Sequence, residues 1–225
     1  MIDKFVQTMA EAMDGVKDGS TVLIGGFGSV GQPVQLIDAL IEQGAKDLTV
    51  VSNNSGIGLV GLGRLLHLRR VRKIICSFPR SPDPVAFLEL YRKGQIELEI
   101  VPQGTMAERM RAAGAGIPAF FTATSVGTRL AEGKEVREIN GRTYVLEHAL
   151  KGDLALVESW EADRWGNLTY RKSGRNFNPV MAMAAELSVV QTMHVRELGE
   201  IDQECIVTPG IFVDRVIHVP DGGPK

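Results

Sequence analysis

The sequence lacks the features that mark several large classes of protein. Its 225 residues include only two cysteines, too few for a disulfide framework or a zinc cluster. No apolar run reaches the roughly 18 residues that a membrane helix requires. The formal net charge is −2, without the basic excess that nucleic-acid binding favours, and the four histidines show no metal-ligand spacing. These absences predict a protein without a metal site, a membrane span or a nucleic-acid partner.

The same lack of special features sets expectations for the cysteines and the N-terminus. Cys76 and Cys205 each lie in an apolar run, so we expect them to be core residues or bystanders. The opening MIDKFVQTMAEAMDGV has charged residues among apolar ones at helical spacing, unlike the apolar core of a signal peptide. We therefore expect a first helix there and a location in the reducing cytoplasm.

Short apolar runs rich in β-branched residues alternate with helical patterns along the chain. This alternation is typical of an α/β fold: an open, mostly parallel sheet with helices on both faces. A hydrophobic content of 44% is enough for one substantial core. We predict a single domain over residues 1–220 and a flexible tail over 221–225. The predicted strands are 20–25, 47–53, 73–78, 97–103, 119–124, 154–159 and 188–193.

Helices are predicted between several of these strands. Residues 33–44 place apolar side chains on one stripe, with proline at the start and glycine at the end. Further helices are predicted over 82–94 and 105–114. Residues 125–150 interrupt the alternation and contain Asn140-Gly141, a strong β-hairpin signal, so we expect a small β-hairpin excursion from the sheet. No internal repeat is expected.

A glycine-rich loop follows the first predicted strand. Its Gly26-x-Gly28-x-x-Gly31 spacing matches the dinucleotide-binding fingerprint. That fingerprint requires an acidic residue after the second strand, where this chain has amides, although an NADP-type site could lack the acid. Pro33 also removes an N–H group from the first helical turn. A nucleotide site and a simple strand-to-helix turn are therefore both open alternatives, and neither is favoured.

With its flanks, this loop resembles the α-subunit signature of the 3-oxoacid CoA-transferase family. The pattern is DG, three apolar residues, GGF, G and P, and it is matched throughout residues 18–33. Further blocks in the same order also resemble the family, so the resemblance covers nearly the whole chain. These blocks are 51–54, 101–105, 107–109, 113–116, 166–170, 175–179 and 208–210.

The resemblance implies an activity, a partner and a fold related to the sugar-phosphate isomerase scaffold. Enzymes of this family move CoA from an acyl-CoA to a free acid through a glutamyl-CoA thioester. Their glutamate lies in a Ser-Glu-Asn-Gly motif on a β subunit, and this chain has no such motif. Glu158 is the nearest local substitute, but we interpret it as a structural or interface residue. We therefore expect a heterodimer or heterotetramer with a β subunit, in which coenzyme A is a substrate and no cofactor is needed.

Amide side chains and the glycine loop are the candidate site residues. Each step of CoA transfer develops negative charge on a carbonyl oxygen, which fixed neutral donors stabilise. Asn54 and Gln103 lie at the C-terminal ends of predicted strands, the edge where α/β sheets bind ligands, and the resemblance implies a catalytic role for both. The candidate substrate-binding residues are Gly25, Gly26, Phe27, Gly28, Gly31, Asn53 and Arg80.

Two blocks bear on the substrate. Residues 76–80 and 163–167 look most like those of subunits that act on 3-oxoadipate with succinyl-CoA as donor. The second carboxylate of 3-oxoadipate needs a cation, and Arg80 is a candidate because a guanidinium binds a carboxylate with two hydrogen bonds. A solvated loop arginine is an equal alternative for Arg80, and acetoacetate is an alternative acceptor. A stand-alone enzyme like the sugar-phosphate isomerases and a non-catalytic binding subunit are the other two hypotheses for the chain.

Overall fold

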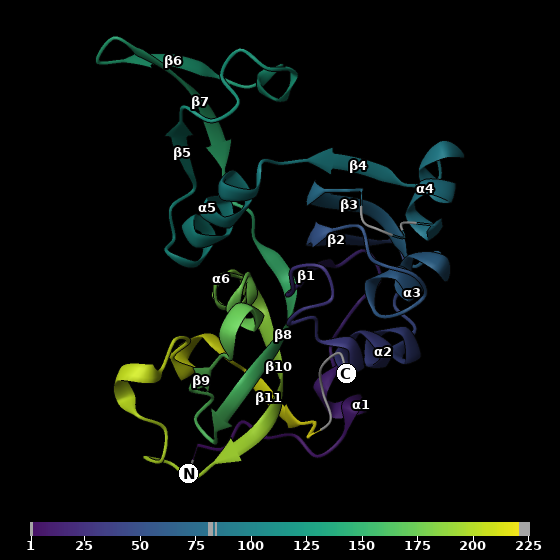
Figure 1. The fold of residues 1–225 in the computed structure, drawn as a ribbon, viewed down its shortest axis with the longest axis vertical. Coiled ribbons are helices and arrows are strands. Elements are labelled where there is room, and N and C mark those ends of the chain that lie inside the picture. Colours follow the sequence, from purple (N-terminus) through teal and green to yellow (C-terminus); the bar gives the residue numbers. More distant parts are fainter. Residues whose placement is uncertain (1, 81–82, 84, 221–225) are drawn as a thin grey trace.

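The computed structural model describes residues 2–80, 83 and 85–220, so the predicted tail over 221–225 lies outside the described residues. One sheet crosses the molecule in the order β11-β10-β8-β1-β2-β3-β4, and all of these neighbours are parallel (Figure 1). The short strand β9 pairs antiparallel with β8. The strands of this sheet are β1 (Thr21–Ile24), β2 (Leu48–Asn54), β3 (Val71–Phe78), β4 (Glu97–Ile100), β8 (Gly152–Asp163), β9 (Leu168–Thr169), β10 (Ala185–Arg196) and β11 (Arg215–His218).

Helices cover both faces of this sheet, as predicted. Alternation along β1 sends Val22 and Ile24 into one hydrophobic cluster and Leu23 into the other. The first cluster is shared with the helices α1 to α4, and the second with α5 and α6. The α/β prediction is therefore confirmed. The helices are α1 (Met9–Ala12), α2 (Val34–Gln43), α3 (Leu62–His67), α4 (Val85–Arg92), α5 (Gln103–Gly114) and α6 (Asn178–Ala182).

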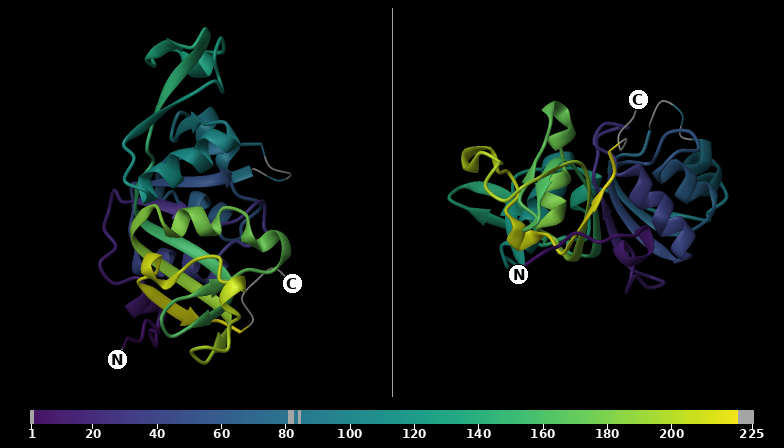
Figure 2. Two further views of the ribbon diagram at one scale, coloured as in Figure 1. Left: turned by 90° about the vertical axis from the view of Figure 1, so that its left-hand side faces the viewer. Right: turned by 90° about the horizontal axis from the view of Figure 1, so that it is seen from below.

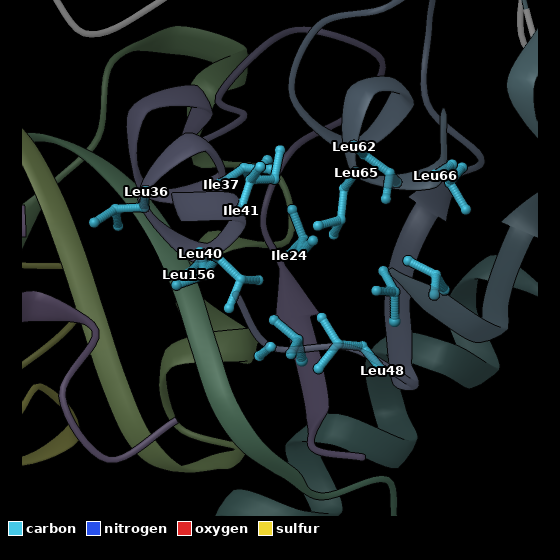
Figure 3. Packing of buried hydrophobic residues seen from close by; sticks show 14 of the residues in the cluster. Ile24, Leu36, Ile37, Leu40, Ile41, Leu48, Leu62, Leu65, Leu66 and Leu156 are labelled. Carbon is cyan, nitrogen blue, oxygen red and sulfur yellow. The ribbon is translucent and has the colours of Figure 1, made fainter. Parts of the chain in front are cut away.

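Helix α2 shows how the sequence specifies this packing. Leu36, Ile37 and Leu40 are fully buried on one stripe, facing Ile24 of β1 and the neighbouring strands (Figure 3). Pro33 precedes the first helical residue, and Gly44 ends the helix in the left-handed conformation with φ 98°. The helix predicted over 33–44 is confirmed almost to the residue.

A small antiparallel sheet projects from the end of the molecule (Figures 1 and 2). It consists of β5 (Ala119–Thr122), β7 (Arg142–His148) and β6 (Val136–Ile139), in that order. Asn140 and Gly141 turn the β6-β7 hairpin with positive φ angles, as predicted. The strand predicted over 119–124 is real, but its place in the parallel sheet was wrong: it pairs antiparallel with β7 and so belongs to the excursion.

The N-terminal expectation needs correction. Helix α1 is a single turn, capped by Thr8 and Glu11, and residues 2–8 before it are not helical. Phe5 makes a parallel bridge with Val216 of β11, so this segment lies along the sheet edge. Helical spacing of apolar residues did not decide the structure, because edge pairing competed with it. Cys76 is buried as expected, whereas Cys205 is exposed.

Several elements were not predicted, or were predicted with wrong ends. The chain also contains α3, α6, β9 and β11, each too short for a clear periodic signal. Strand β4 ends at Ile100, and α5 begins at Gln103, so the strand predicted over 97–103 was too long. The helix predicted over 82–94 corresponds to α4, and part of its predicted start lies outside the described residues. Short 3-10 turns complete the fold: η1 (Arg129–Ala131), η2 (Lys172–Arg175), η3 (Gln203–Cys205) and η4 (Gly210–Phe212).

The order of the strands indicates where a ligand site is expected. The chain leaves β1 toward β2 on one side, whereas it leaves β8 toward β10 on the other. In open α/β sheets, ligands bind outside the carboxyl ends of the strands where the connections diverge in this way. The glycine loop after β1 lies at this divergence point.

Candidate functional site

A cavity of about 440 Å³ lies beside the glycine loop at the carboxyl ends of β2 and β3. The structure brings five of the predicted site residues together here, although they come from three separate parts of the chain. Ile57, Ser77 and Phe78 also line the cavity, and of these Ile57 belongs to none of the sequence blocks that resemble the family. The five predicted lining residues are Phe27, Gly28, Asn53, Asn54 and Gln103.

The two asparagines at the end of β2 are buried and oriented by hydrogen bonds. Asn54 accepts a hydrogen bond from the Gly56 N–H at 2.8 Å, and its Nδ2 lies 3.4 Å from the Gly28 carbonyl oxygen. The Ser77 hydroxyl donates to Asn53 Oδ1 at 2.8 Å, which leaves the Asn53 amide nitrogen as its donor. Both side chains therefore present N–H groups next to the cavity, although amides alone are common in turns.

Gln103 occupies the first position of α5. Its side chain is exposed, and the residue before it is Pro102, which makes no side-chain cap. An uncapped helix start leaves backbone N–H groups unpaired and carries the positive end of the helix dipole. Thr105, in the same turn, has a buried hydroxyl without a hydrogen-bonding partner among the described residues. This end of α5 adds donor character to the cavity without adding a formal charge.

Most N–H groups of the glycine loop are already engaged. The Gly25 N–H donates to the Leu156 carbonyl at 3.0 Å, and the Gly26 N–H donates to Asn176 Oδ1 at 3.0 Å. Phe27 and Val30 bond to each other in both directions. In the part of the chain that the structure describes, the N–H groups of Gly28, Ser29 and Gly31 have no such partner. Of these three residues, Gly28 lines the cavity.

The glycine loop is one of two similar turns of six residues each. We call residues 26–31 the first glycine turn and residues 56–61 the second glycine turn. Both read glycine, apolar, glycine, any residue, valine, glycine, and they follow β1 and β2. All three glycines of each turn have positive φ, and each turn closes with an antiparallel bridge, Phe27 to Val30 and Ile57 to Val60. Cavity-lining Phe27 and Ile57 occupy the same position in the two turns.

A second cavity of about 370 Å³ lies on the other side of the first glycine turn. Gly31 and Glu158 line it, and the Arg171 guanidinium stacks over the Trp160 ring at 4.5 Å. Burial raises the pKa of Glu158 to about 7, and a hydrogen bond from Gln191 at 3.2 Å offsets only part of this effect. Gly31 is therefore a predicted site residue that lines the second cavity, whereas Asn53, Asn54 and Gln103 line the first.

Arg80 also lies outside the group of predicted site residues that line the first cavity. It is exposed after the end of β3 and is not one of the described residues that line the first cavity. Residues 2–80, 83 and 85–220 contain no group of three or more His, Cys, Asp or Glu side chains that could hold a metal ion. In the same ranges, no helix has both the length and the apolar character needed to cross a membrane.

The fold and the cavity together define an α/β protein with neutral amide side chains gathered at the carboxyl ends of its strands. The profile of the Coenzyme A transferase family matches residues 6–218, and this chain belongs to that family. It is 58% identical to the A subunit of the 3-oxoadipate CoA-transferase of Pseudomonas putida, with 97% of this chain and 95% of that protein covered. It is 49% identical to the A subunit of a probable succinyl-CoA:3-ketoacid coenzyme A transferase of Bacillus subtilis, covering 95% and 89%.

A solved structure supports the same fold. An acyl-CoA transferase from Escherichia coli O157:H7, described as a thioester complex with CoA, superposes with a TM-score of 0.84 at 19% identity. The match covers 98% of this chain and 48% of that one, so this chain spans about half the length of that structural neighbour. At this identity the likeness concerns the fold. Family membership shows that the chain is a CoA-transferase, as the sequence blocks implied.

Proposed function

We propose that this chain is the α subunit of a CoA-transferase that moves CoA from succinyl-CoA to 3-oxoadipate, and that a β subunit supplies the nucleophilic glutamate. The observation that carries this proposal is the first cavity: it gathers amides and a glycine turn, and its described lining includes no acidic or cysteine side chain. Similarity to a relative named for 3-oxoadipate CoA transfer supports the substrate assignment. Coenzyme A is then a substrate, and the transferred group needs no resident cofactor because the glutamate carries it.

The chemistry follows from what such a cavity can stabilise. The partner's carboxylate attacks the thioester carbonyl, which releases CoA as a thiolate and leaves an acyl-glutamyl anhydride. The thiolate attacks the glutamyl carbonyl, releases the first acid and forms a glutamyl thioester. The acceptor carboxylate then attacks the glutamyl thioester, which releases the CoA thiolate and forms a second anhydride. The thiolate attacks the acceptor's carbonyl in this anhydride, which forms the new acyl-CoA and frees the glutamate. Each attack places negative charge on a carbonyl oxygen, and donors such as Asn54 and Gln103 stabilise it.

Neutral donors suit this chemistry better than cations. An arginine or lysine beside the attacking glutamate would form an ion pair and weaken its nucleophilicity. The first cavity has no cationic side chain among its described lining residues. Asn54, Gln103 and the Gly28 N–H can instead donate hydrogen bonds while the nucleophile stays reactive.

The test is reconstitution with the β subunit. The purified chain alone should have no transferase activity, and adding the β subunit should restore it. In the complex, Gln103→Ala should lower kcat about tenfold or more, equivalent to roughly 1.4 kcal/mol of transition-state stabilisation. Gln95→Ala is the matched control, because Gln95 is exposed at the opposite end of β4 from the cavity. Unchanged turnover in folded, assembled Gln103→Ala would refute the role of Gln103.

A second candidate acceptor is a shorter 3-oxo acid such as acetoacetate. It is favoured by the position of Arg80, which is not among the described lining residues, and by similarity to a relative named for 3-ketoacids. Comparing kcat/KM for 3-oxoadipate and acetoacetate in the Arg80→Ala complex separates the candidates. If kcat/KM falls for 3-oxoadipate but not for acetoacetate, Arg80 binds the second carboxylate. An equal fall for both acids contradicts that role.

A further inference from the structure

Two asparagines near the end of the chain hold the first glycine turn from the side opposite the first cavity. We propose that Asn176 and Asn178 are positioning residues for CoA transfer, because they fix the backbone that presents Gly28 and Phe27 to the first cavity. This inference rests on the proposed function of that cavity. The two residues lie about 150 positions away in sequence, just before and at the start of α6.

Asn176 forms hydrogen bonds with both arms of the turn. Its Oδ1 accepts a hydrogen bond from the Gly26 N–H at 3.0 Å, and its Nδ2 donates to the Val30 carbonyl at 3.0 Å. Gly26 and Val30 flank the tip, so one side chain fixes the distance between the two arms. The same amide also bonds to the Ser173 carbonyl at 2.9 Å, which ties the turn to η2.

Asn178 anchors the base of the turn. Its side chain is fully buried, and Nδ2 donates to the Gly31 and Gly174 carbonyls, both at 2.9 Å. Its Oδ1 accepts from the Glu158 N–H at 3.0 Å. Both amide atoms are therefore used, and the base of the turn is joined to β8. Buried amides with this many partners hold their neighbours in one arrangement.

The glycine pattern fits this anchoring. A methyl group on Gly25 would collide with Asn178 Oδ1, and one on Gly31 would lie 2.7 Å from Asn176 Nδ2. Gly25 and Gly31 therefore allow the two asparagine amides to approach the backbone. Gly28 is different, because a methyl group there would meet open space. The glycine spacing that resembles a nucleotide motif thus has two separate uses: close packing at the base and an open face at the tip.

The anchoring can affect the reaction through the tip of the turn, because Phe27 and Gly28 line the first cavity. Among the described residues that line the first cavity, Asn54 alone bonds to the tip through its side chain, by a long contact of 3.4 Å from Nδ2 to the Gly28 carbonyl oxygen. The rest of the support comes from the paired Phe27 and Val30 and from Asn176 beneath them. Loss of Asn176 should therefore let the Gly28 N–H and the Phe27 ring move out of register with Asn54 and Gln103.

The test compares Asn176→Ala with a matched amide side chain elsewhere. Gln43, the last residue of α2, also uses both amide atoms: it donates to the Val16 carbonyl and accepts from the Ala45 N–H, both at 2.9 Å. It precedes β2, whereas the first cavity lies at the carboxyl end of that strand. In the α–β complex, we expect Asn176→Ala to lower kcat about tenfold with KM changed less than about threefold, since positioning acts on the transition state. Gln43→Ala should keep kcat within about twofold of the native complex.

Two further readouts separate positioning from stability. Asn176→Asp keeps the acceptor for the Gly26 N–H and loses only the donated bonds, so its kcat should recover partly. Hydrogen exchange of residues 26–31 should accelerate in Asn176→Ala and stay unchanged in Gln43→Ala. A folded Asn176→Ala complex with native kcat would overturn the proposal. If the native complex itself lacks CoA-transferase activity, the proposed function fails instead, while the exchange result still tests the anchoring.

Discussion

The two glycine turns have the same local sequence pattern and the same hairpin shape but different anchorage. Both carry positive φ at all three glycines and both close with a bridge between apolar residues. The first glycine turn is held by Asn176 and Asn178 from the distant end of the chain. The second is held by segments nearer in sequence: the Gly58 N–H donates to the Asp83 carbonyl at 2.9 Å, and Gly56 lies close to the backbone of Gly63 in α3. Local sequence thus specifies the turn, and long-range contacts specify how rigidly it faces the cavity.

Asn54 and Gln32 connect the two turns. Asn54 accepts a hydrogen bond from the Gly56 N–H at 2.8 Å, and its Nδ2 lies 3.4 Å from the Gly28 carbonyl oxygen. Gln32 directly follows the first turn, and its Oε1 lies 3.4 Å from the Leu62 N–H, just after the second. Asn176 and Asn178, in contrast, bond to the first turn. This asymmetry predicts that equivalent changes will have unequal effects in the two turns.

The largest contrast is expected between Gly31→Ala and Gly61→Ala, the last glycines of the two turns. At Gly31, the new methyl group would lie 2.6 Å from the Gly174 carbonyl, a backbone atom that cannot move alone. At Gly61 it would collide with the Gln32 side-chain amide, which can shift more readily than a backbone atom. Both glycines have positive φ, so both changes add backbone strain. We expect a loss of about 3 kcal/mol or more at Gly31, and about 1–2 kcal/mol at Gly61.

Denaturant unfolding of the isolated chain measures this contrast. The midpoint should fall further for Gly31→Ala, with similar m-values for the two variants. Equal losses would mean that the asparagine anchorage adds nothing beyond the strain of a left-handed residue. The comparison between the turns would then reduce to their shared hairpin.

The sequence alone was sufficient for the parts of this site that depend on local patterns. Strand ends carrying Asn54 and the start of α5 at Gln103 could be located to within a few residues, because hydrophobic runs and proline mark them. The repeated glycine pattern at 56–61 was also readable and was missed, because six residues are too few to stand out as a repeat. The family blocks added the chemistry that these patterns lack.

Other features depended on tertiary contacts that no local pattern encodes. The contacts of Asn176 and Asn178 with the first glycine turn join positions about 150 residues apart, so they could not be predicted from spacing. The raised pKa of Glu158 requires knowing what buries it. The segment around Phe5 looked helical and instead pairs with Val216, because an open sheet edge was available. In each case a distant partner overrode the local preference.

Glu158 distinguishes the surroundings of the two turns. It lines the second cavity together with Gly31 of the first glycine turn. The described residues that line the first cavity, where Ile57 of the second glycine turn lies, include no ionisable side chain. Burial raises the pKa of Glu158 from 4.5 to about 7. Below about pH 4.5 both the folded and unfolded forms are protonated, so folding carries no penalty. As the pH rises toward 7, only the unfolded chain loses its proton, and stability falls by up to about 3 kcal/mol.

Glu158→Gln should therefore be more stable than the native chain at pH 8 and about equal to it near pH 4. Unfolding free energies measured across this range check the expectation, and the pair near pH 4 serves as the internal control. The variant retains a polar side chain that can still bond to Gln191. A constant difference at all pH values would show that the change acts through packing and not through the proton.

The smallest stability effect is expected at the tips. Gly28 and Gly58 have φ 64° and 55°, and a methyl group meets open space at the first and an ordinary contact at 3.6 Å from Asp83 at the second. Alanine at either site should cost about 1–2 kcal/mol from backbone strain alone, and the two costs should match. Turnover should not match: Gly28 lines the first cavity, so Gly28→Ala should lower kcat of the α–β complex while Gly58→Ala leaves it nearly unchanged. If both variants lose activity equally, the first glycine turn has no special place in the chemistry, and the anchoring by Asn176 serves stability alone.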